Sequence, residues 1–314
     1  MTAIVTLTMN PALDVTTSTP AVEPTHKLRC AAPRYDPGGG GINVARTIIR
    51  LGGDALAIYP SGGATGAYLT RLMEQEAVPT RVIPIAGTTR ESFSVTDGAS
   101  GQQFRFVLPG PRLMANEWHA CRDAVAAQST SPGWLVAGAS LPPGVDDAFY
   151  AELAAFCREQ GIRFVLDTSG PALEACRGAK AFLIKPSATE LASLVGDRLA
   201  DERTELDAAQ HVRALGYAEN VVVSLGARGA LLVTASGHVQ MTAPHITARS
   251  GVGAGDAMLG AIVYKLASGI PMAAAVRYGI VAGAAAALGS GTQLMRPCDV
   301  DRLGAVSTVP EKCG

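Results

Sequence analysis

The chain lacks an excess of charge of either sign. Only 17% of its 314 residues are charged, and 26 Lys and Arg against 27 Asp and Glu leave a formal net charge of -1. Binding to nucleic acid or to an anionic membrane usually depends on a basic surface, so this balance argues against both partners. We therefore expect a small molecule as the partner.

The sequence also lacks a long uninterrupted apolar run and a basic leader. Its most apolar stretch, residues 272–288, is mostly alanine and glycine and contains Arg277, which favours a buried helix over a membrane span. The first residues alternate as a β-strand would, rather than resembling a signal peptide.

Metal-binding and disulfide patterns are missing as well. The six cysteines are scattered without a Cys-x-x-Cys pair, and the five histidines show no metal-ligand spacing. A structural zinc site or a disulfide framework is therefore not expected, and a reduced cytoplasmic location is favoured.

Glycine, in contrast, is abundant and clustered. The chain has 35 glycines, with one run at residues 38–41 and a second cluster at residues 251–255, and each cluster leads into a segment typical of a helix. Neither cluster matches the P-loop pattern, because no lysine follows at the right spacing, and the second departs from Gly-x-Gly-x-x-Gly. The pattern indicates anion binding by another arrangement.

The second cluster ends in Asp256, directly before an apolar helical segment. Backbone N–H groups from Gly253, Ala254, Gly255 and Asp256, with the positive end of the helix dipole, could hold a migrating phosphoryl group. Asp256 would then act as a base that accepts a proton. The alternative is that Asp256 is only a helix N-cap.

The pattern of elements predicts an α/β fold. Short apolar runs at 134–137, 164–167, 182–185 and 221–224 are typical of parallel strands buried on both faces. Residues 91–96 and 103–108 alternate around a turn and predict an antiparallel hairpin, which with residues 12–35 would form a small sheet acting as a lid. We therefore expect a main body of residues 1–11, 36–88 and 109–314, and a discontinuous β lid of residues 12–35 and 89–108.

Several polar residues lie where such a fold binds its ligands, and for each of them a purely structural role is the alternative. Lys27, Arg29 and Arg90 on the lid could clamp a phosphate or be solvated surface charges. Asp14 could bind sugar hydroxyls or cap a turn, and Asn43 could bind a polyol or lie on an exposed face. The pair Ser187 and Glu190 could hold Mg²⁺ through water or form a capping box.

Taken together, residues 6–14, Gly38-Gly39-Gly40-Gly41-Ile42-Asn43-Val44-Ala45 and Gly253-Ala254-Gly255-Asp256 resemble the ribokinase-like (PfkB) family of sugar kinases. Within the family, the four uninterrupted glycines, residues 27–30, 105–110 and 140–144 are most similar to the bacterial branch that acts on fructose 6-phosphate. Related branches that act on fructose 1-phosphate or tagatose 6-phosphate usually carry a lysine in place of Gly40.

The resemblance implies a three-layer α/β/α sandwich with a mostly parallel sheet and a small β-sheet lid, in a homodimer joined through the lid. It implies ATP-dependent phosphorylation of the 1-hydroxyl of fructose 6-phosphate, giving fructose 1,6-bisphosphate and ADP. The alternatives are a kinase of fructose 1-phosphate or tagatose 6-phosphate, or a non-catalytic sensor of sugar phosphate or nucleotide. A nucleoside kinase is disfavoured because an uncharged nucleoside would not use a cationic clamp.

The resemblance also implies roles for individual residues. The catalytic set is Asp256, Gly253, Ala254 and Gly255, and the sugar phosphate would be bound by Asp14, Lys27, Arg29, Gly39, Gly40, Asn43, Arg90 and Ser140. The residues lining the ATP site would be Lys185, Ser187, Ser224, Leu225, Gly226, Gly229 and Gly251. Mg²⁺ would lie near Glu190 through water, and K⁺ beside Ser250, Val252, Gly289 and Gly291. The family commonly has Asn where this chain has Ser187, and Asp-Thr where it has Ser250-Gly251, which weakens the metal expectations.

Overall fold

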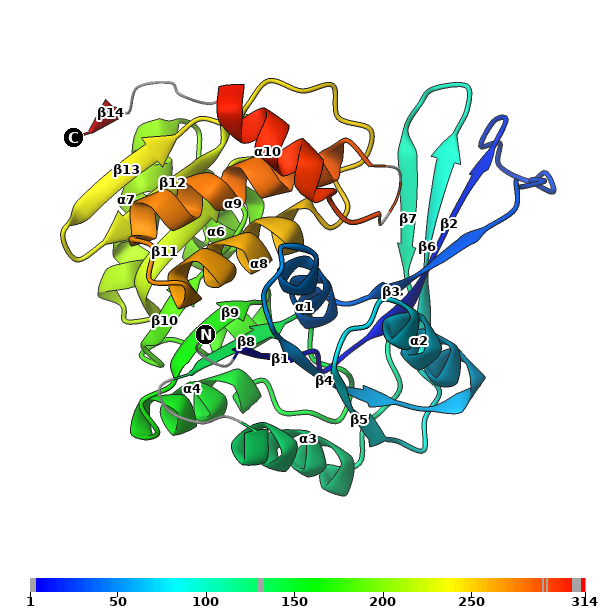
Figure 1. The fold of residues 1–314 in the computed structure, drawn as a ribbon, viewed down its shortest axis with the longest axis horizontal. Coiled ribbons are helices and arrows are strands. Elements are labelled where there is room, and N and C mark those ends of the chain that lie inside the picture. The colour runs from blue at the N-terminus through cyan, green and yellow to red at the C-terminus, as the bar shows by residue number, and fades with distance from the viewer. Residues whose placement is uncertain (1–3, 129–132, 290, 292, 307–311, 314) are drawn as a thin grey trace.

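In the computed structural model, which describes residues 4–128, 133–289, 291, 293–306 and 312–313, the chain forms a layered body and a small sheet that stands out from one side (Figure 1). The body contains a ten-stranded sheet of order β14-β13-β12-β11-β10-β9-β8-β1-β4-β5. From β11 to β5 in that order the neighbouring strands are parallel, and β12, β13 and β14 add antiparallel pairs at the other edge. The predicted mostly parallel sheet is confirmed. Its strands are β1 (Ile4–Leu7), β4 (Leu56–Ser61), β5 (Thr80–Pro84), β8 (Trp134–Gly138), β9 (Arg163–Asp167), β10 (Ala181–Ile184), β11 (Ala218–Ser224), β12 (Ala230–Thr234), β13 (Gly237–Met241) and β14 (Lys312–Cys313).

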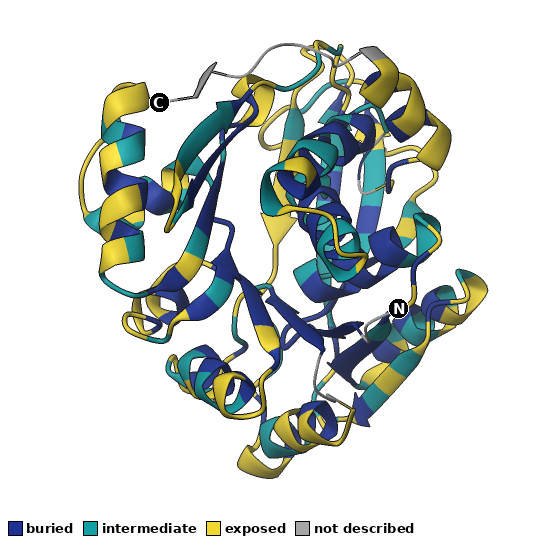
Figure 2. Ribbon diagram, turned by 60° about the vertical axis from the view of Figure 1, so that its left-hand side comes forward, coloured by how far each residue is buried: buried dark blue, intermediate teal, exposed yellow. Residues whose placement is uncertain are grey.

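Helices cover both faces of this sheet. One layer packs against the side chains of Leu135 and Leu166, and the other against those of Trp134 and Val165, so alternate residues of each strand enter different cores. Figure 2 shows the resulting buried strands between more exposed helices. The first layer holds α3 (Ala115–Gln128), α4 (Phe149–Glu159), α5 (Pro171–Glu174), α6 (Ala188–Val195) and α7 (Glu202–Ala214); the second holds α1 (Gly40–Arg50), α2 (Gly63–Gln75), α8 (Ala254–Ala267) and α9 (Met272–Ala287), with α10 (Pro297–Val306) packed on α9.

The small sheet has the order β3-β2-β6-β7 and joins two segments that are far apart in the sequence. Its strands are β2 (Ala12–Thr19), β3 (Arg34–Gly38), β6 (Arg90–Asp97) and β7 (Gln103–Val107). The predicted hairpin is β6 and β7, while β2 and β6 pair in parallel, with Ala12 opposite Arg90. Because β3 continues to Gly38, the sheet extends three residues past position 35, where the expected lid segment ends.

The two faces of the small sheet differ in chemistry. The register places Asp14, Ser94 and Arg105 on one face, whereas Val15, Phe93 and Phe106 lie on the other. Helix α2 packs against β2 and β3 and leaves Phe106 half exposed, at 52%. The polar face is therefore available to a ligand on the body, and the apolar face keeps an uncovered part.

The apolar segment 272–288 forms α9, which is largely buried, as the sequence predicts. Among the described residues, no helix has both the length and the apolar character needed to cross a membrane.

Candidate active site

Asp256 lies in the first turn of α8. The preceding Gly253 is the N-cap and has a left-handed backbone, with φ of 76°. The first N–H groups of an α-helix have no partner within the helix, so this turn presents donors beside the Asp256 carboxylate. The Asn43 side-chain amide donates a hydrogen bond to Asp256 Oδ2 at 2.8 Å. Asp256 is thus more than a capping residue, because a side chain 213 positions away fixes its carboxylate.

The glycine run before Asn43 allows α1 to approach the ends of β1 and β8. A Cβ on Gly41 would overlap Leu7 O, and one on Gly40 would lie 3.1 Å from Ala139 N and 3.2 Å from the carbonyl carbon of Gly138. The N–H of Ile42 donates to Thr8 Oγ1 at 2.7 Å, so the residue directly after β1 satisfies one N–H of the helix start. The run therefore serves close packing, which brings Asn43 to the centre of the site.

A buried ion pair lies behind Asp256. Lys185 Nζ is 3.0 Å from Asp167 Oδ2, and only 5% of the Lys185 side chain is exposed. A Cβ on Gly255 would lie 3.2 Å from Lys185 Nζ, so the ammonium group sits directly against the first turn of α8. Burial opposes the charge of Lys185, but Asp167, with Asp256 and Glu190, holds the pKa of Lys185 above its usual value.

Removal of water by the surrounding protein raises the pKa of Asp256 to about 6. The negative charge of Asp167 raises it further, whereas the Asn43 hydrogen bond and the positive charges of Lys185 and Arg105 lower it. A carboxylate that titrates near neutrality can take up and release a proton under ordinary conditions. Asp256 therefore has the protonation behaviour of a general base.

A second acidic group, Asp14, faces the body from β2. Burial raises its pKa to about 7, although Arg105 and Arg90 lower it, and a Cβ on Gly38 would overlap its carboxylate. Both arginines come from the β6–β7 hairpin. The polar face of the small sheet thus carries Asp14 with Arg90 and Arg105, beside the ion pair of Asp36 and Arg34 on β3.

A cavity of about 560 Å³ opens between the hairpin and the loop after β8. Arg90, Asn10, Ser140 and Leu108 are among the residues that line it. The Arg90 guanidinium donates to the backbone oxygens of Asn10, at 3.0 Å, and Leu108, at 3.1 Å, while Asn10 Nδ2 donates to Ser140 Oγ at 3.2 Å. The cavity combines a fixed guanidinium with a hydroxyl, which suits a phosphate group.

The residues predicted to line a nucleotide form two adjacent loops. Ser187 and Ser224 form a bridge, and Ser224 N donates to Pro186 O at 2.9 Å. Leu225 N donates to Gly229 O at 2.9 Å, which closes a loop around the short helix Gly226–Arg228. Ser187 caps α6 in a capping box with Glu190, so the structural role of this pair is present. Among the described residues, no group of three or more His, Cys, Asp or Glu could hold a metal.

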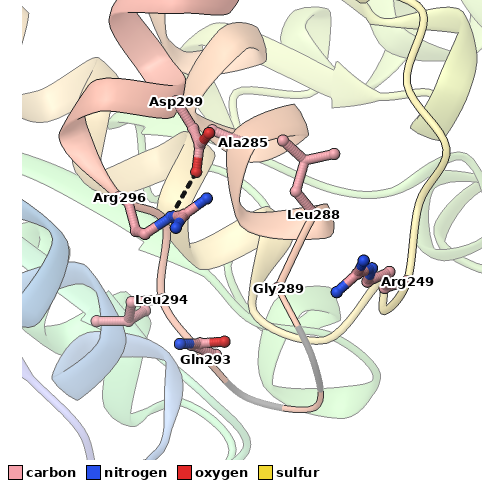
Figure 3. A pocket seen from close by; sticks show the side chains of 8 residues that line it. All are labelled: Arg249, Ala285, Leu288, Gly289, Gln293, Leu294, Arg296 and Asp299. Carbon is pink, nitrogen blue, oxygen red and sulfur yellow. Dashed lines mark hydrogen bonds and ion pairs between the residues drawn. The ribbon is translucent and has the colours of Figure 1, made fainter.

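The segments predicted to hold K⁺ lie together. Ser250 Oγ donates to Gly291 O at 2.9 Å, and Val252 N donates to Ser250 Oγ at 3.2 Å. Gly289 lines a separate small pocket of about 140 Å³ that opens beside this contact, where Arg249 points into the space and Arg296 pairs with Asp299 (Figure 3). Gly251 is exposed and makes no close contact that a side chain would disturb.

Lys27 and Arg29 do not join the others. They are exposed in the turn beyond β2, where Thr19 Oγ1 donates to Arg29 O at 3.4 Å. Arg90 lies opposite Ala12 at the other end of β2. The seven steps of the strand from Ala12 to Thr19, at about 3.3 Å each, separate the two ends by roughly 23 Å. The cationic clamp is therefore not formed within one chain.

Three residues of the site were not singled out by the sequence. Arg105 and Asn10 lie within stretches that the family resemblance quotes, but alternation alone did not show that the charge of Arg105 would act on the pKa of Asp256. Asp167 is the last residue of the buried strand β9, at the edge of the sheet where ligands are expected, and this position was the available signal for it.

Comparison with known proteins agrees with this geometry. The family model for pfkB family carbohydrate kinases matches residues 3–298. The "ATP-dependent 6-phosphofructokinase isozyme 2" of Mycobacterium tuberculosis (strain ATCC 25618 / H37Rv) is 47% identical over 99% of this chain and 91% of its own length, and that of Escherichia coli (strain K12) is 43% identical over 97% and 99%. Crystal structures of phosphofructokinase-2 from Escherichia coli, one with substrates and products and one with potassium, each superpose with a TM-score of 0.93 at 42% identity, covering 98% of this chain and all of theirs.

Proposed function

Because the chain belongs to the pfkB family of carbohydrate kinases, we propose that it is an ATP-dependent 6-phosphofructokinase, which transfers a phosphoryl group to the 1-hydroxyl of fructose 6-phosphate. The 47% and 43% identity to curated proteins of that activity, over nearly the whole chain, supports the choice of sugar. The observation that carries the chemistry is Asp256, held by Asn43 at a helix start.

In the proposed reaction Asp256 accepts the proton of the 1-hydroxyl as that oxygen attacks the γ-phosphorus of ATP, and ADP leaves. The N–H groups from Gly253 to Asp256 stabilise the charge on the migrating group. A pKa of about 6 keeps Asp256 in its basic form at neutral pH. Lys185, held by Asp167, adds a fixed positive charge against the same turn.

The sugar phosphate would bind between the polar face of the lid and the body. Asp14 would accept hydrogen bonds from sugar hydroxyls, and Gly39, Gly40 and Asn43 would lie beside the same sugar. The phosphate would lie in the cavity lined by Arg90 and Ser140. Arg105, which acts electrostatically on both Asp14 and Asp256, would lie over the reacting groups.

We also propose that the chain forms a homodimer through the lid. Lys27 and Arg29 are too far from Arg90 to bind the same phosphate within one chain, but a second copy packed on the lid could supply them. The exposed Phe104 and Phe106 provide an apolar surface for that copy, and a four-stranded sheet gains stability from such packing.

ATP would lie along the loops of Lys185, Ser187, Ser224, Leu225, Gly226 and Gly229, with Gly251 beside it. Mg²⁺ would arrive with the phosphates and contact Glu190 through water, by the carboxylate oxygen Oε1, because the capping box engages Oε2. K⁺ would be held by oxygens around Ser250, Val252, Gly289 and Gly291, segments that converge through the Ser250 hydrogen bond. Mg²⁺ supplies charge neutralisation of the phosphates when it is bound.

The candidate substrates are distinguished by the rates at which the protein phosphorylates them. We would measure ADP release in a coupled assay with fructose 6-phosphate, fructose 1-phosphate, tagatose 6-phosphate, free fructose and a nucleoside, with and without K⁺. The proposal expects the highest kcat/KM for fructose 6-phosphate. A higher value for either rival phosphate would reassign the substrate, and binding of ATP without ADP release from any substrate would favour a sensor.

Gly40 is the position at which the rival branches usually carry a lysine. In this chain an added Cβ at Gly40 would lie 3.1 to 3.3 Å from backbone atoms of Gly138 and Ala139, so the close packing found here suits a glycine.

A further inference from the structure

The side chain of Arg46, on α1 one turn after Asn43, is almost completely buried, with 1% exposed. Burying a guanidinium is costly unless its donors are used. Its hydrogen-bond partners are all acceptors of this chain: Glu76 at the end of α2, Pro37 O in β3 and Asn43 Oδ1. Arg46 thus connects three elements that border the site.

We propose that Arg46 is a positioning residue for catalysis, which fixes the orientation of the Asn43 side-chain amide and thereby the Asp256 carboxylate. The proposal rests on the proposed kinase function of Asp256.

The argument begins with the two ends of the Asn43 amide. An arginine side chain carries only donors, so the atom of Asn43 that faces Arg46 Nη1, at 3.1 Å, must be the acceptor Oδ1. The other end, Nδ2, then points to Asp256 Oδ2 at 2.8 Å, where it donates to a carboxylate. Without Arg46 the amide could turn over and place its oxygen against the carboxylate, an arrangement without an N–H donor.

Glu76, and not Asp256, balances the charge of Arg46. Its Nε donates to Glu76 Oε2 at 2.9 Å and its Nη2 to Glu76 Oε1, so the guanidinium forms a two-bond pair with that carboxylate. Burial favours neutral Glu76, but the hydrogen bonds and charge of Arg46, with Arg50, hold the pKa of Glu76 below its usual value. The pair holds Arg46 rigidly and leaves Asn43 as its link to the site.

The third partner ties the sugar side to the same group. Arg46 Nη1 also donates to Pro37 O at 2.8 Å, and Pro37 pairs with Leu13 in the small sheet, next to Asp14. One guanidinium therefore sets both the strand beside the sugar-binding Asp14 and the amide beside the base Asp256.

The test is a double-mutant cycle in the full-length protein. Arg46→Met and Asn43→Ala are made singly and together, and kcat and KM are measured for fructose 6-phosphate and ATP. We expect each single variant to lower kcat about 10- to 100-fold, the range for a misplaced catalytic group, with KM for ATP nearly unchanged. The double variant should lose little more than Asn43→Ala alone, because both changes break one link.

Arg46→Lys is the second variant, used for the cycle if Arg46→Met does not fold. A lysine keeps the charge but cannot span Glu76, Pro37 and Asn43 together, so kcat should remain low. The control is Leu153→Ala, a core truncation in α4 of the opposite helix layer, which lowers stability without touching the site. Its kcat should match that of the wild type at a temperature where both are folded.

Additive losses in the cycle, full kcat in Arg46→Lys, or an equal fall of kcat in Leu153→Ala would each overturn the proposal. A wild-type protein without kinase turnover would instead contradict the proposed function, so the two failures are distinguishable.

Discussion

Asp256 is a single carboxylate whose surroundings bring its pKa close to neutrality. Desolvation is the largest cause that raises its pKa to about 6, and Asp167 adds to it, while Asn43, Lys185 and Arg105 keep the value from rising further. Because the ordinary value is 3.8, this group becomes protonated as the pH falls through about 6 rather than through 3.8. A base is active only when deprotonated, so the sign of the dependence follows.

We expect kcat/KM for fructose 6-phosphate, which reports the protonation of the free protein, to fall as the pH is lowered through about 6. In Asp256→Asn, turnover should be lower by a factor of about 10² to 10⁴, with sugar binding nearly intact, since the amide keeps the shape but not the basicity. The control is the exposed Asp123→Asn, which should retain both the rate and the profile. A rate that stays constant down to pH 5 in folded protein, or an active Asp256→Asn, would remove Asp256 as the base.

Part of the site was predictable from the sequence because local rules apply to it. The glycines before Asp256 and the capping box of Ser187 and Glu190 are short-range patterns, and the structure contains both features. The partners of Asp256 were not predictable, since Asn43, Asp167 and Lys185 reach it only through the packing of α1 and two strand ends against α8. The roles of these residues in binding and catalysis stay predictions.

At the scale of elements, the small sheet touches the body at the segments expected to hold K⁺. Gln103 Oε1 of β7 lies 3.3 Å from Ser250 Oγ, whose hydroxyl donates to Gly291 O at the shorter distance of 2.9 Å. Gly291, with φ of 60°, packs so closely on Thr16 of β2 that an added Cβ would overlap the threonine side chain. Alternation predicted strands β6 and β7. It did not predict this contact, which depends on how the small sheet packs against the body.

Gly291→Ala should therefore disturb closure of the lid. We expect a several-fold higher KM for fructose 6-phosphate and a lower kcat, because closure completes the sugar site. The matched control is Gly178→Ala, where φ is 80° and an added Cβ meets nothing, so the backbone strain is similar without a lid contact. Equal kinetic effects in both variants would mean that strain, and not the lid contact, matters at Gly291.

For the whole molecule, the fold was largely predictable, whereas the homodimer that the family resemblance implies stays a proposal. Buried apolar runs predicted the parallel strands, since strands covered on both faces need apolar side chains throughout. The antiparallel edge of β12 and β13 was not predicted, although Leu231, Leu232 and Val233 are buried there. Distances within one chain leave Lys27 and Arg29 apart from Arg90, which is the reason for the proposed dimer.

We expect Phe106→Glu to convert a dimer into monomers in sedimentation experiments and to raise KM for fructose 6-phosphate, because a charge on the apolar face opposes its burial. Met114→Glu is the control, since Met114 is an exposed apolar residue outside the lid, at 58% exposure. If Phe106→Glu stays dimeric with normal KM, the subunits do not meet through this face.

The parallel pairing of Ala12 with Arg90 has a consequence for synthesis of the protein. A nascent chain emerging from the ribosome exposes β2 and β3 well before β6 exists, and α1, β4, α2 and β5 are made in between. The hairpin of β2 and β3 must therefore wait with an open edge, which is a known point of misassociation. Proper seating of Asp14 is consequently a late event, which follows the emergence of residue 107.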